Sequence, residues 1–245
     1  MSFNAKDYWN KRLDEQFSLK GVGYITFSQF YNKWLYKRKE KSLEKIFAKY
    51  LPDLQNKKVL DIGCGTGFFV ERYVNKGAKI SGIDITTKSI NELSKRFPQG
   101  KFHLLDLGDS NSVLDEKFDV INMWDVMYHI VDNESFSQAC KNIAAMSAPG
   151  AYFLVTDFLG AENERRPAPH VAFRDLRKYE DVLLAEGYRL VQIVPLYRFL
   201  NRHYRWGLRV TNFLAPILFF LDNHNNKVMT NNLSIGIWKF EKQTV

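Results

Sequence analysis

Short, β-branched apolar runs alternate along the chain with longer segments whose apolar residues recur at helical spacing. Because strands that alternate with helices pair in parallel, this order predicts an α/β fold with a doubly wound sheet. Two further apolar runs end the chain, and an antiparallel arrangement is expected for them. Expected strands are 58–61, 79–84, 101–104, 118–123, 152–156, 188–194 and 233–240, and expected helices are 68–75, 87–96, 134–147 and 174–185.

Three segments lie outside this alternating unit. The first is an N-terminal arm, residues 6–50, with two helical patterns joined through Gly21-Val22-Gly23, and it is expected to cap the carboxyl edge of the sheet. The second, 160–172, is rich in proline and charge, and the third, 198–227, separates the last two strands. Both are candidate lids over a site. Without an internal repeat or a linker, the sequence predicts a single domain over residues 1–245.

Composition narrows the class of protein. With 45% hydrophobic and 25% charged residues among 245, the chain is not collagen-like, of low complexity or a disulfide scaffold. The net charge of +8 favours anionic partners. Cys64 and Cys140 have no metal-ligand or disulfide spacing, which favours a reducing, cytoplasmic compartment. The N-terminus has no signal-peptide pattern, and the longest apolar run, 210–221, is shorter than the roughly 20 residues that span a bilayer.

A glycine-rich turn follows the first expected strand. Gly63, Gly65 and Gly67 allow a tight turn and a close approach of the backbone to a ligand, which indicates a nucleotide-type site. The spacing is GxGxG rather than the GxGxxG of dinucleotide sites, with Phe68 in place of the last glycine. Asp61, before the first glycine, would repel a pyrophosphate but accept hydrogen bonds from an ammonium group, so a ligand with a cationic amino-acid end is favoured.

This loop, Asp61-Ile-Gly-Cys-Gly-Thr-Gly67, resembles the first motif of the class I S-adenosylmethionine-dependent methyltransferases, and the resemblance extends over residues 45–158. It implies a Rossmann-like, mostly parallel seven-stranded sheet with an antiparallel C-terminal strand, and S-adenosylmethionine as the cofactor. It also implies that Asp84, in Ile83-Asp84-Ile85, holds the ribose hydroxyls, that Asp106, in Leu105-Asp106-Leu107, holds the adenine amino group, and that the backbone near Trp124 meets the methionine part. Residues 51–160 are then the cofactor-binding core, 1–50 the arm, and 161–245 the substrate-side insertions with the last two strands.

The N-terminal arm carries a second, weaker resemblance. Asp7-Tyr8-Trp9-Asn10-Lys11-Arg12 is similar to the Tyr-Trp-x-x-Arg opening of many small-molecule and glycan methyltransferases, where such a helix lies over the cofactor. Alternatively, both aromatic residues only bury the arm against the domain. The expected cofactor-binding residues are Tyr8, Trp9, Asp61, Gly63, Cys64, Gly65, Asp84, Ile85, Asp106, Leu107 and Trp124.

A base is needed only if the acceptor begins protonated, and a neutral histidine suits that role near pH 7. The catalytic candidates are His129, in the loop after the fourth strand, and His170, in the proline-bounded loop. His103 falls in an expected core strand and is read as structural. Asp125, Tyr128 and Asp157 are further candidates for substrate contact. Asp125 and Asp157 lack the acid-plus-amide pair of the magnesium-dependent branch, so no metal is expected.

Basic residues gather near the C-terminus. Residues 187–221 contain no Asp or Glu, and the spacing of Arg198, Arg202, Arg205 and Arg209 predicts one cationic helix face. That face suits an anionic substrate, an anionic membrane beside the apolar segment 213–221, or solvent. Nucleic acid is not expected, because the fourth-strand motif lacks the Asn/Asp-Pro-Pro-aromatic pattern of amino-methylating enzymes of this fold.

The sequence therefore favours an enzyme that transfers methyl from S-adenosylmethionine to an oxygen or nitrogen of a small molecule, such as a sugar, a lipid-linked precursor or a secondary metabolite. RNA or protein side-chain methylation and a non-catalytic, cofactor-binding scaffold remain as alternatives. The oligomeric state is left open.

Overall fold

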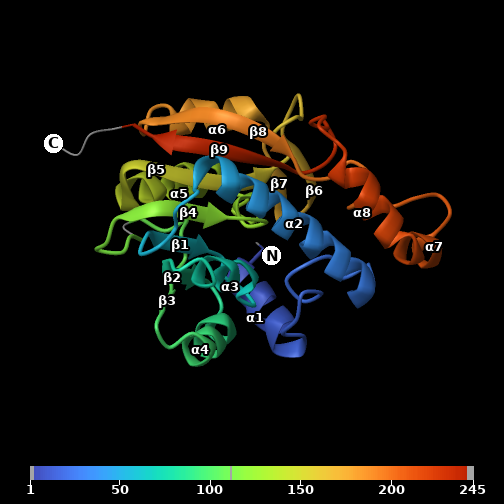
Figure 1. The fold of residues 1–245 in the computed structure, drawn as a ribbon, viewed down its shortest axis with the longest axis horizontal. Helices are drawn as coiled ribbons and strands as arrows, with labels where there is room; N and C mark the ends of the chain where they lie inside the picture. The colour runs from blue at the N-terminus through green and yellow to red at the C-terminus, as the bar shows by residue number, and fades with distance from the viewer. Residues whose placement is uncertain (1–2, 111, 242–245) are drawn as a thin grey trace.

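The computed structural model describes residues 3–110 and 112–241. Its main sheet has seven strands in the order β3-β2-β1-β4-β5-β9-β8, and β1 to β5 are parallel (Figure 1). β9 is antiparallel to both β5 and β8, which confirms the expected C-terminal arrangement. The strands are β1 Lys58–Ile62, β2 Lys79–Asp84, β3 Lys101–Leu104, β4 Phe118–Met123, β5 Ser147–Asp157, β8 Tyr188–Pro195 and β9 Ser234–Phe240.

Helices cover both faces of this sheet and bury two apolar clusters (Figure 1). One cluster joins Phe47, on the long helix α2, and Val70 to the sheet, and the other joins Phe136 and Ile143 to the opposite face. The helices are α1 Ala5–Glu15, α2 Gln29–Tyr50, α3 Phe68–Val74, α4 Thr87–Arg96, the short 3-10 helix η1 Met127–His129, α5 Asn133–Met146, α6 Leu176–Leu183, α7 Leu208–Phe213 and α8 Ala215–Asn223.

Side-chain caps begin several of these helices where the sequence places them. Ser28 accepts a hydrogen bond from the backbone N–H of Tyr31 at the start of α2, and Asp132 does the same for Ser135 at the start of α5. Thr86 stands at the expected start of α4, but its hydroxyl donates to Asp84 and makes no capping bond. This hydrogen bond joins Thr86 to the end of β2, beside the candidate site.

The N-terminal arm and the proline-bounded loop have defined structure. α1 and α2 confirm the two helical patterns of the arm. Segment 160–172, expected to be a loop, contains β6 Arg165–Ala168 and begins β7 Val171–Phe173, which form an antiparallel pair. This hairpin contacts η1, just after β4.

The predicted arginine helix face is wrong. Arg198, Arg202 and Arg205 lie in irregular chain, and only Arg209 belongs to a helix, α7. The buried carboxylate of Asp222, on α8, accepts hydrogen bonds from the backbone N–H groups of residues 198–200, which bends the chain away from helical geometry.

Two further expectations need correction. His103 is exposed because β3 is an edge strand, so it is not in the core. β5 begins at Ser147, before Pro149-Gly150, where the chain was expected to turn. A register shift opposite residues 118–120 and a positive φ of 78° at Gly150 accommodate the proline within the strand.

Candidate active site

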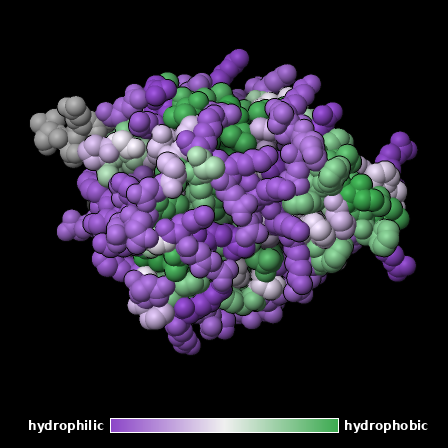
Figure 2. Space-filling model, in the orientation of Figure 1, coloured by the Kyte–Doolittle hydropathy of each residue, from purple (hydrophilic) through white to green (hydrophobic). Residues whose placement is uncertain are grey.

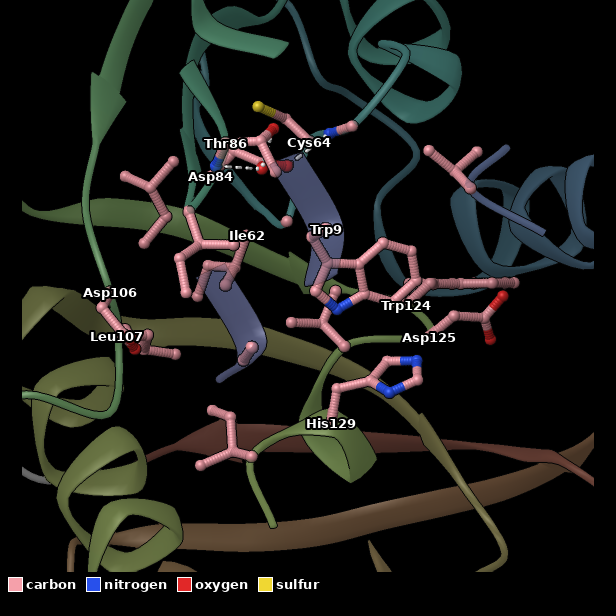
Figure 3. Close-up of a pocket in the computed structure, with 18 of the residues that line it drawn as sticks. Trp9, Ile62, Cys64, Asp84, Thr86, Asp106, Leu107, Trp124, Asp125 and His129 are labelled. Atoms are coloured by element: carbon pink, nitrogen blue, oxygen red, sulfur yellow. Dashed lines mark hydrogen bonds between the residues drawn. The ribbon is translucent and has the colours of Figure 1, made fainter. Parts of the chain in front are cut away.

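A cavity of about 270 Å³ lies at the carboxyl ends of β1, β2 and β4. Chain order reverses between β1 and β4, and doubly wound sheets bind ligands at such a point. Gly63, Gly65 and Asp84 line it from the strand ends, and Trp9 lines it from the N-terminal arm, so α1 does cap this edge. Figure 3 shows Asp106 and Leu107 on one side of this glycine-loop cavity and Trp124, Asp125 and His129 on the other.

The backbone shape of the glycine loop depends on the absence of side chains at its glycines. Gly63, Gly65 and Gly67 have φ values of 68°, 49° and 78°, in the left-handed region that favours glycine. A Cβ at Gly63 would lie 2.2 Å from Cγ2 of Val126, which is closer than atoms can approach. The loop can therefore hold this shape only with glycine at that position.

Asp84 fixes the same loop from the end of β2. One carboxylate oxygen accepts a hydrogen bond from the backbone N–H of Gly65 at 2.8 Å. The other accepts from the N–H and the hydroxyl of Thr86, at 2.9 and 2.7 Å (Figure 3). Burial raises the pKa of Asp84, and these hydrogen bonds act in the opposite sense. Asp84 is thus a positioned acceptor on the wall of the cavity.

Most residues expected to touch the cofactor line this cavity, and two do not. Cys64, Ile85 and Asp106 are in its wall with the residues named above. Tyr8 lies outside it, in the wall of a neighbouring cavity. Asp61 is buried behind the loop and does not line it.

Asp61 links the end of β1 to the end of β4. Its Oδ1 accepts a hydrogen bond of 2.7 Å from Nδ2 of Asn122, on β4, while its Oδ2 has no hydrogen-bond partner within residues 3–110 and 112–241. Burial raises the pKa of Asp61 to about 7. The direct contact with an ammonium group expected from the sequence is not supported by this position, and Asp61 acts on the loop through β1 and β4.

A second cavity, also of about 270 Å³, adjoins the first. We call it the tyrosine cavity, because Tyr8, Tyr24, Tyr36, Tyr128 and Tyr197 line it. The two cavities share Trp9, Val22, Tyr36, Lys39, Asp125 and His129 in their walls. The two cavities therefore adjoin beside these residues, Asp125 and His129 among them.

His129 and His170, which are 41 residues apart in the chain, meet at this junction. Nδ1 of His129 lies 2.8 Å from the carbonyl oxygen of His170. Because a carbonyl only accepts, Nδ1 carries the hydrogen and Nε2 keeps its lone pair in the neutral ring. Burial lowers the pKa of His129 to about 4, so the ring is neutral near pH 7. Trp9 packs against it at a ring distance of 4.9 Å.

His170 itself lines only the tyrosine cavity. Its ring stacks on Tyr8 at 5.1 Å and on His129 at 5.8 Å. Burial lowers its pKa, with a smaller contribution from the positive charge of Arg12. His170 thus positions His129 through its backbone carbonyl and forms part of the wall through its ring.

An ion pair between Lys39 and Asp125 also lies at the junction. Lys39 comes from α2, and Asp125 follows β4 with a φ of 60°, held there by the hydroxyl of Thr156, which accepts its N–H at 2.8 Å. Burial alone lowers the pKa of Lys39, but the Asp125 carboxylate more than offsets this and the pKa is raised. The site therefore keeps a cation beside the shared wall.

Lys39 was not expected at the site, and Arg12, which lines the tyrosine cavity, was expected only as part of the Tyr-Trp-x-x-Arg opening. Lys39 lies in the charged run 37–41, where it does not stand out, although it shares a helical face with Leu35, Leu43 and Ile46. Arg12 lies 4.8 Å from the centre of the Trp9 ring, and its guanidinium donates to the phenol oxygen of Tyr8 at 3.1 Å and to the backbone carbonyl of Gly23. It links α1 to the turn before α2.

Asp157 is a structural residue rather than a site residue. It is fully buried, outside both cavity walls, and accepts hydrogen bonds from the hydroxyl of Tyr179 and the N–H of Phe158, each at 2.7 Å. The sequence-based suggestion that it contacts substrate is wrong. In the described part of the chain, no group of three or more His, Cys, Asp or Glu residues is arranged to hold a metal ion.

Known proteins resemble this chain in sequence. The ubiquinone biosynthesis O-methyltransferase of Haemophilus ducreyi is 35% identical over 112 residues, covering 42% of this chain and 46% of that protein. Its counterpart in Chromobacterium violaceum is 30% identical over 129 residues, covering 48% and 55%. The chain thus spans about half the length of the curated relatives it matches.

The fold has a known counterpart over nearly its whole length. The structure of magnesium protoporphyrin IX methyltransferase from Synechocystis with bound S-adenosylmethionine superposes with a TM-score of 0.62 at 16% identity, covering 98% of this chain and 99% of that one. A model of the methyltransferase domain matches residues 31–193, which include the glycine loop, Asp84 and both histidines. Because this match covers well over half of the chain, the protein belongs to the methyltransferase domain family.

Proposed function

We propose that this protein transfers a methyl group from S-adenosylmethionine to an oxygen atom of a small molecule. The observation that carries the proposal is the shared wall of the two cavities. His129 stands there with Nδ1 bonded to a carbonyl and with Nε2 making no hydrogen bond to residues 3–110 or 112–241, beside the cation of Lys39. An acceptor hydroxyl in the tyrosine cavity would thus meet a neutral base next to the cofactor cavity.

The glycine-loop cavity fits the cofactor because carboxylates in its wall can accept hydrogen bonds from the ribose and the adenine. The carboxylate of Asp84 would accept the two ribose hydroxyls, and Asp106, exposed after β3, would accept from the adenine amino group. The methionine end would lie near Trp124, where the rings of Trp9 and Tyr36 and the carboxylate of Asp125 suit a positive sulfonium. When bound, S-adenosylmethionine supplies an electrophilic methyl group.

The chain's own residues would then accept the proton of the acceptor hydroxyl and stabilise the charge that develops on its oxygen. Nε2 of His129 accepts the proton as the acceptor O–H bond breaks, and the new bond forms between that oxygen and the methyl carbon. The carbon–sulfur bond breaks in the same displacement, which leaves S-adenosylhomocysteine. Lys39 stabilises negative charge that develops on the oxygen.

We infer that the acceptor is a phenol or a similarly acidic hydroxyl on a flat molecule. Aromatic side chains, Tyr8, Tyr36, Tyr128 and Phe173 among them, form much of the tyrosine cavity and suit stacking on a planar ring. Lys39 and Arg12 add positive charge, which favours an acceptor with anionic character. The names of the relatives from Haemophilus and Chromobacterium also refer to methylation of oxygen.

The direct test is methyl transfer from labelled S-adenosylmethionine to a panel of catechols, other phenols, aliphatic alcohols and amines, with tRNA and a protein fraction as further acceptors. Label on a phenol oxygen, lost in His129→Gln, is the expected result. Gln can still donate a hydrogen bond to the carbonyl of His170 but is not a base. Label only on an amine, on RNA or on protein would overturn the proposed acceptor, and cofactor binding without any transfer would favour a scaffold.

A further inference from the structure

The α7–α8 segment carries an apolar surface that faces solvent. Phe213 is 80% exposed, and Ile217, Phe220 and Leu221 are 57%, 63% and 41% exposed. Ile217, Phe220 and Leu221 recur on α8 at positions i, i+3 and i+4, so they share one of its faces, and Phe213 ends α7 four residues before Ile217. Figure 1 shows the segment projecting from the body of the molecule, and Figure 2 shows a hydrophobic surface over this projection.

The opposite face of α8 already has its partner. Ala215, Leu218 and Phe219 are buried, and the ring of Phe219 lies 5.1 Å from that of Trp34 on α2. Fixing α8 to the domain therefore does not need the outer face. Contiguous apolar surface of this kind on a folded chain marks an interaction site.

Cations border the apolar face. Arg205 and Arg209 are exposed at the start of the segment, and Lys37 and Lys41, exposed on α2, lie along its packed side, with Nζ atoms 5.4 and 5.9 Å from the centre of the buried Phe219 ring. Within the described residues none of these four side chains forms an ion pair. No acidic residue occurs from 187 to 221. The border is therefore free to bind anionic groups.

We propose that the α7–α8 surface docks on an anionic lipid bilayer. The phenylalanines and Ile217 enter the boundary between headgroups and acyl chains, and the arginines and lysines bind lipid phosphates. A projecting apolar ridge with a cationic border fits the plane of a bilayer. No helix within residues 3–110 and 112–241 has the length and apolar character to cross a membrane, so the contact is with the surface.

Docking there would bring the tyrosine cavity close to the lipid. Asn201 and His203 line that cavity, and the same stretch of chain leads into α7 through Tyr204, whose ring stacks on Trp206 at 4.5 Å. Tyr24 and Ile25, also in the cavity wall, are exposed. This consequence rests on the proposed function: a lipophilic acceptor would enter from the bilayer at this edge.

The test is flotation with vesicles of phosphatidylcholine, alone or mixed with phosphatidylglycerol. The wild-type protein is expected to float with the mixed vesicles. Phe213→Ser/Phe220→Ser should lower the partition coefficient by about tenfold or more, because two large apolar side chains no longer enter the lipid. Leu184→Ser, which removes an apolar side chain that is 56% exposed on α6's C-terminal side, should change nothing.

Charge is tested separately with Arg205→Gln/Arg209→Gln, which should weaken binding to the mixed vesicles and reduce its dependence on salt. Melting temperature and cofactor binding report that each variant is folded. Absence of wild-type binding, or equal binding by the serine variant, would overturn the proposal. The proposal would also be overturned if the wild-type protein self-associates without binding vesicles and the serine variant does not self-associate. The surface would then join two copies of the chain. Flotation needs no methyl transfer, so this proposal and the proposed function fail separately.

Discussion

Asp84→Asn tests the cofactor site with the smallest change in shape. The carboxylate of Asp84 accepts three hydrogen bonds, one from Gly65 through Oδ2 and two from Thr86 through Oδ1. An amide nitrogen can replace one oxygen only by facing an N–H donor. The less costly orientation keeps both bonds to Thr86 and turns the amide nitrogen toward the N–H of Gly65.

The effect of Asp84→Asn on stability and on cofactor binding can be estimated from these hydrogen bonds. Losing one hydrogen bond to a buried charged group lowers the free energy of unfolding by about 1.5–3 kcal/mol, partly offset because burial of a charge is relieved. For the cofactor, Oδ2 of the carboxylate keeps a lone pair for a ribose hydroxyl, whereas the amide nitrogen that takes its place cannot accept a hydrogen bond. A loss of about 3 kcal/mol in binding corresponds to a Kd for S-adenosylmethionine that rises by about 100-fold.

Calorimetric titration with S-adenosylmethionine and S-adenosylhomocysteine measures this Kd. The matched control is Asp119→Asn, at the amino end of β4, where the carboxylate also accepts a backbone N–H, that of Lys58 at 2.8 Å, but lies outside both cavities. It should bind as the wild type does. A Kd for Asp84→Asn within about twofold of the wild-type value, in a folded protein, would refute the assignment of Asp84 to the ribose, because the expected change is about 100-fold.

Three further predictions follow from the site. His129→Gln should lower kcat on a phenol by about 100-fold or more while the Kd for S-adenosylmethionine changes little, since only proton transfer is removed; equal kcat values would exclude His129 as the base. Lys39→Met should lower the free energy of unfolding, measured in urea, by about 3 kcal/mol, because the mostly buried Asp125 is left unpaired; adding Asp125→Asn should recover part of that loss. The folded-state pKa of Asp61, about 7, lies above its unfolded value, so its contribution to stability is complete below about pH 4 and is lost as the pH rises to 7. Asp61→Asn should remove about 2.5 kcal/mol of this dependence between pH 5 and 8 in urea titrations, and an unchanged dependence would show that Asp61 does not titrate there.

Local sequence carries the cofactor side of the site. The glycine loop is a short motif whose backbone angles only glycine adopts readily, and Asp84 and Asp106 follow strands that the apolar pattern marks. Since parallel strands end at one edge, the order of strands is enough to bring these residues together. The sequence also predicts that Asp61 touches the ligand, but its burial behind the loop depends on Asn122, 61 residues further on.

The acceptor side depends on contacts between distant segments. Lys39 pairs with Asp125 across 86 residues, and the two side chains meet only because α2 packs on the sheet. The helical face that Lys39 shares with Leu35 and Leu43 is a local sign of its burial, but no local pattern indicates that its partner is Asp125. The arginine stripe shows the opposite error: helical spacing is present, but Asp222 binds the backbone N–H groups of 198–200 and so prevents the helix.

The absence of the predicted helix changes which side chains lie beside the basic residues of this segment. On a continuous helix, the four arginines would share one face along residues 198–209. In the folded chain, the irregular stretch ends at Gly207, whose φ of 87° begins α7, and Arg209 then lies four residues before the exposed Phe213. Cations and apolar side chains thus come to border one surface, next to the stretch that lines the tyrosine cavity. The same irregular geometry that overturns the predicted helix face places the proposed membrane-binding surface beside the proposed acceptor cavity, so a methyl acceptor dissolved in lipid is the substrate class to assay first.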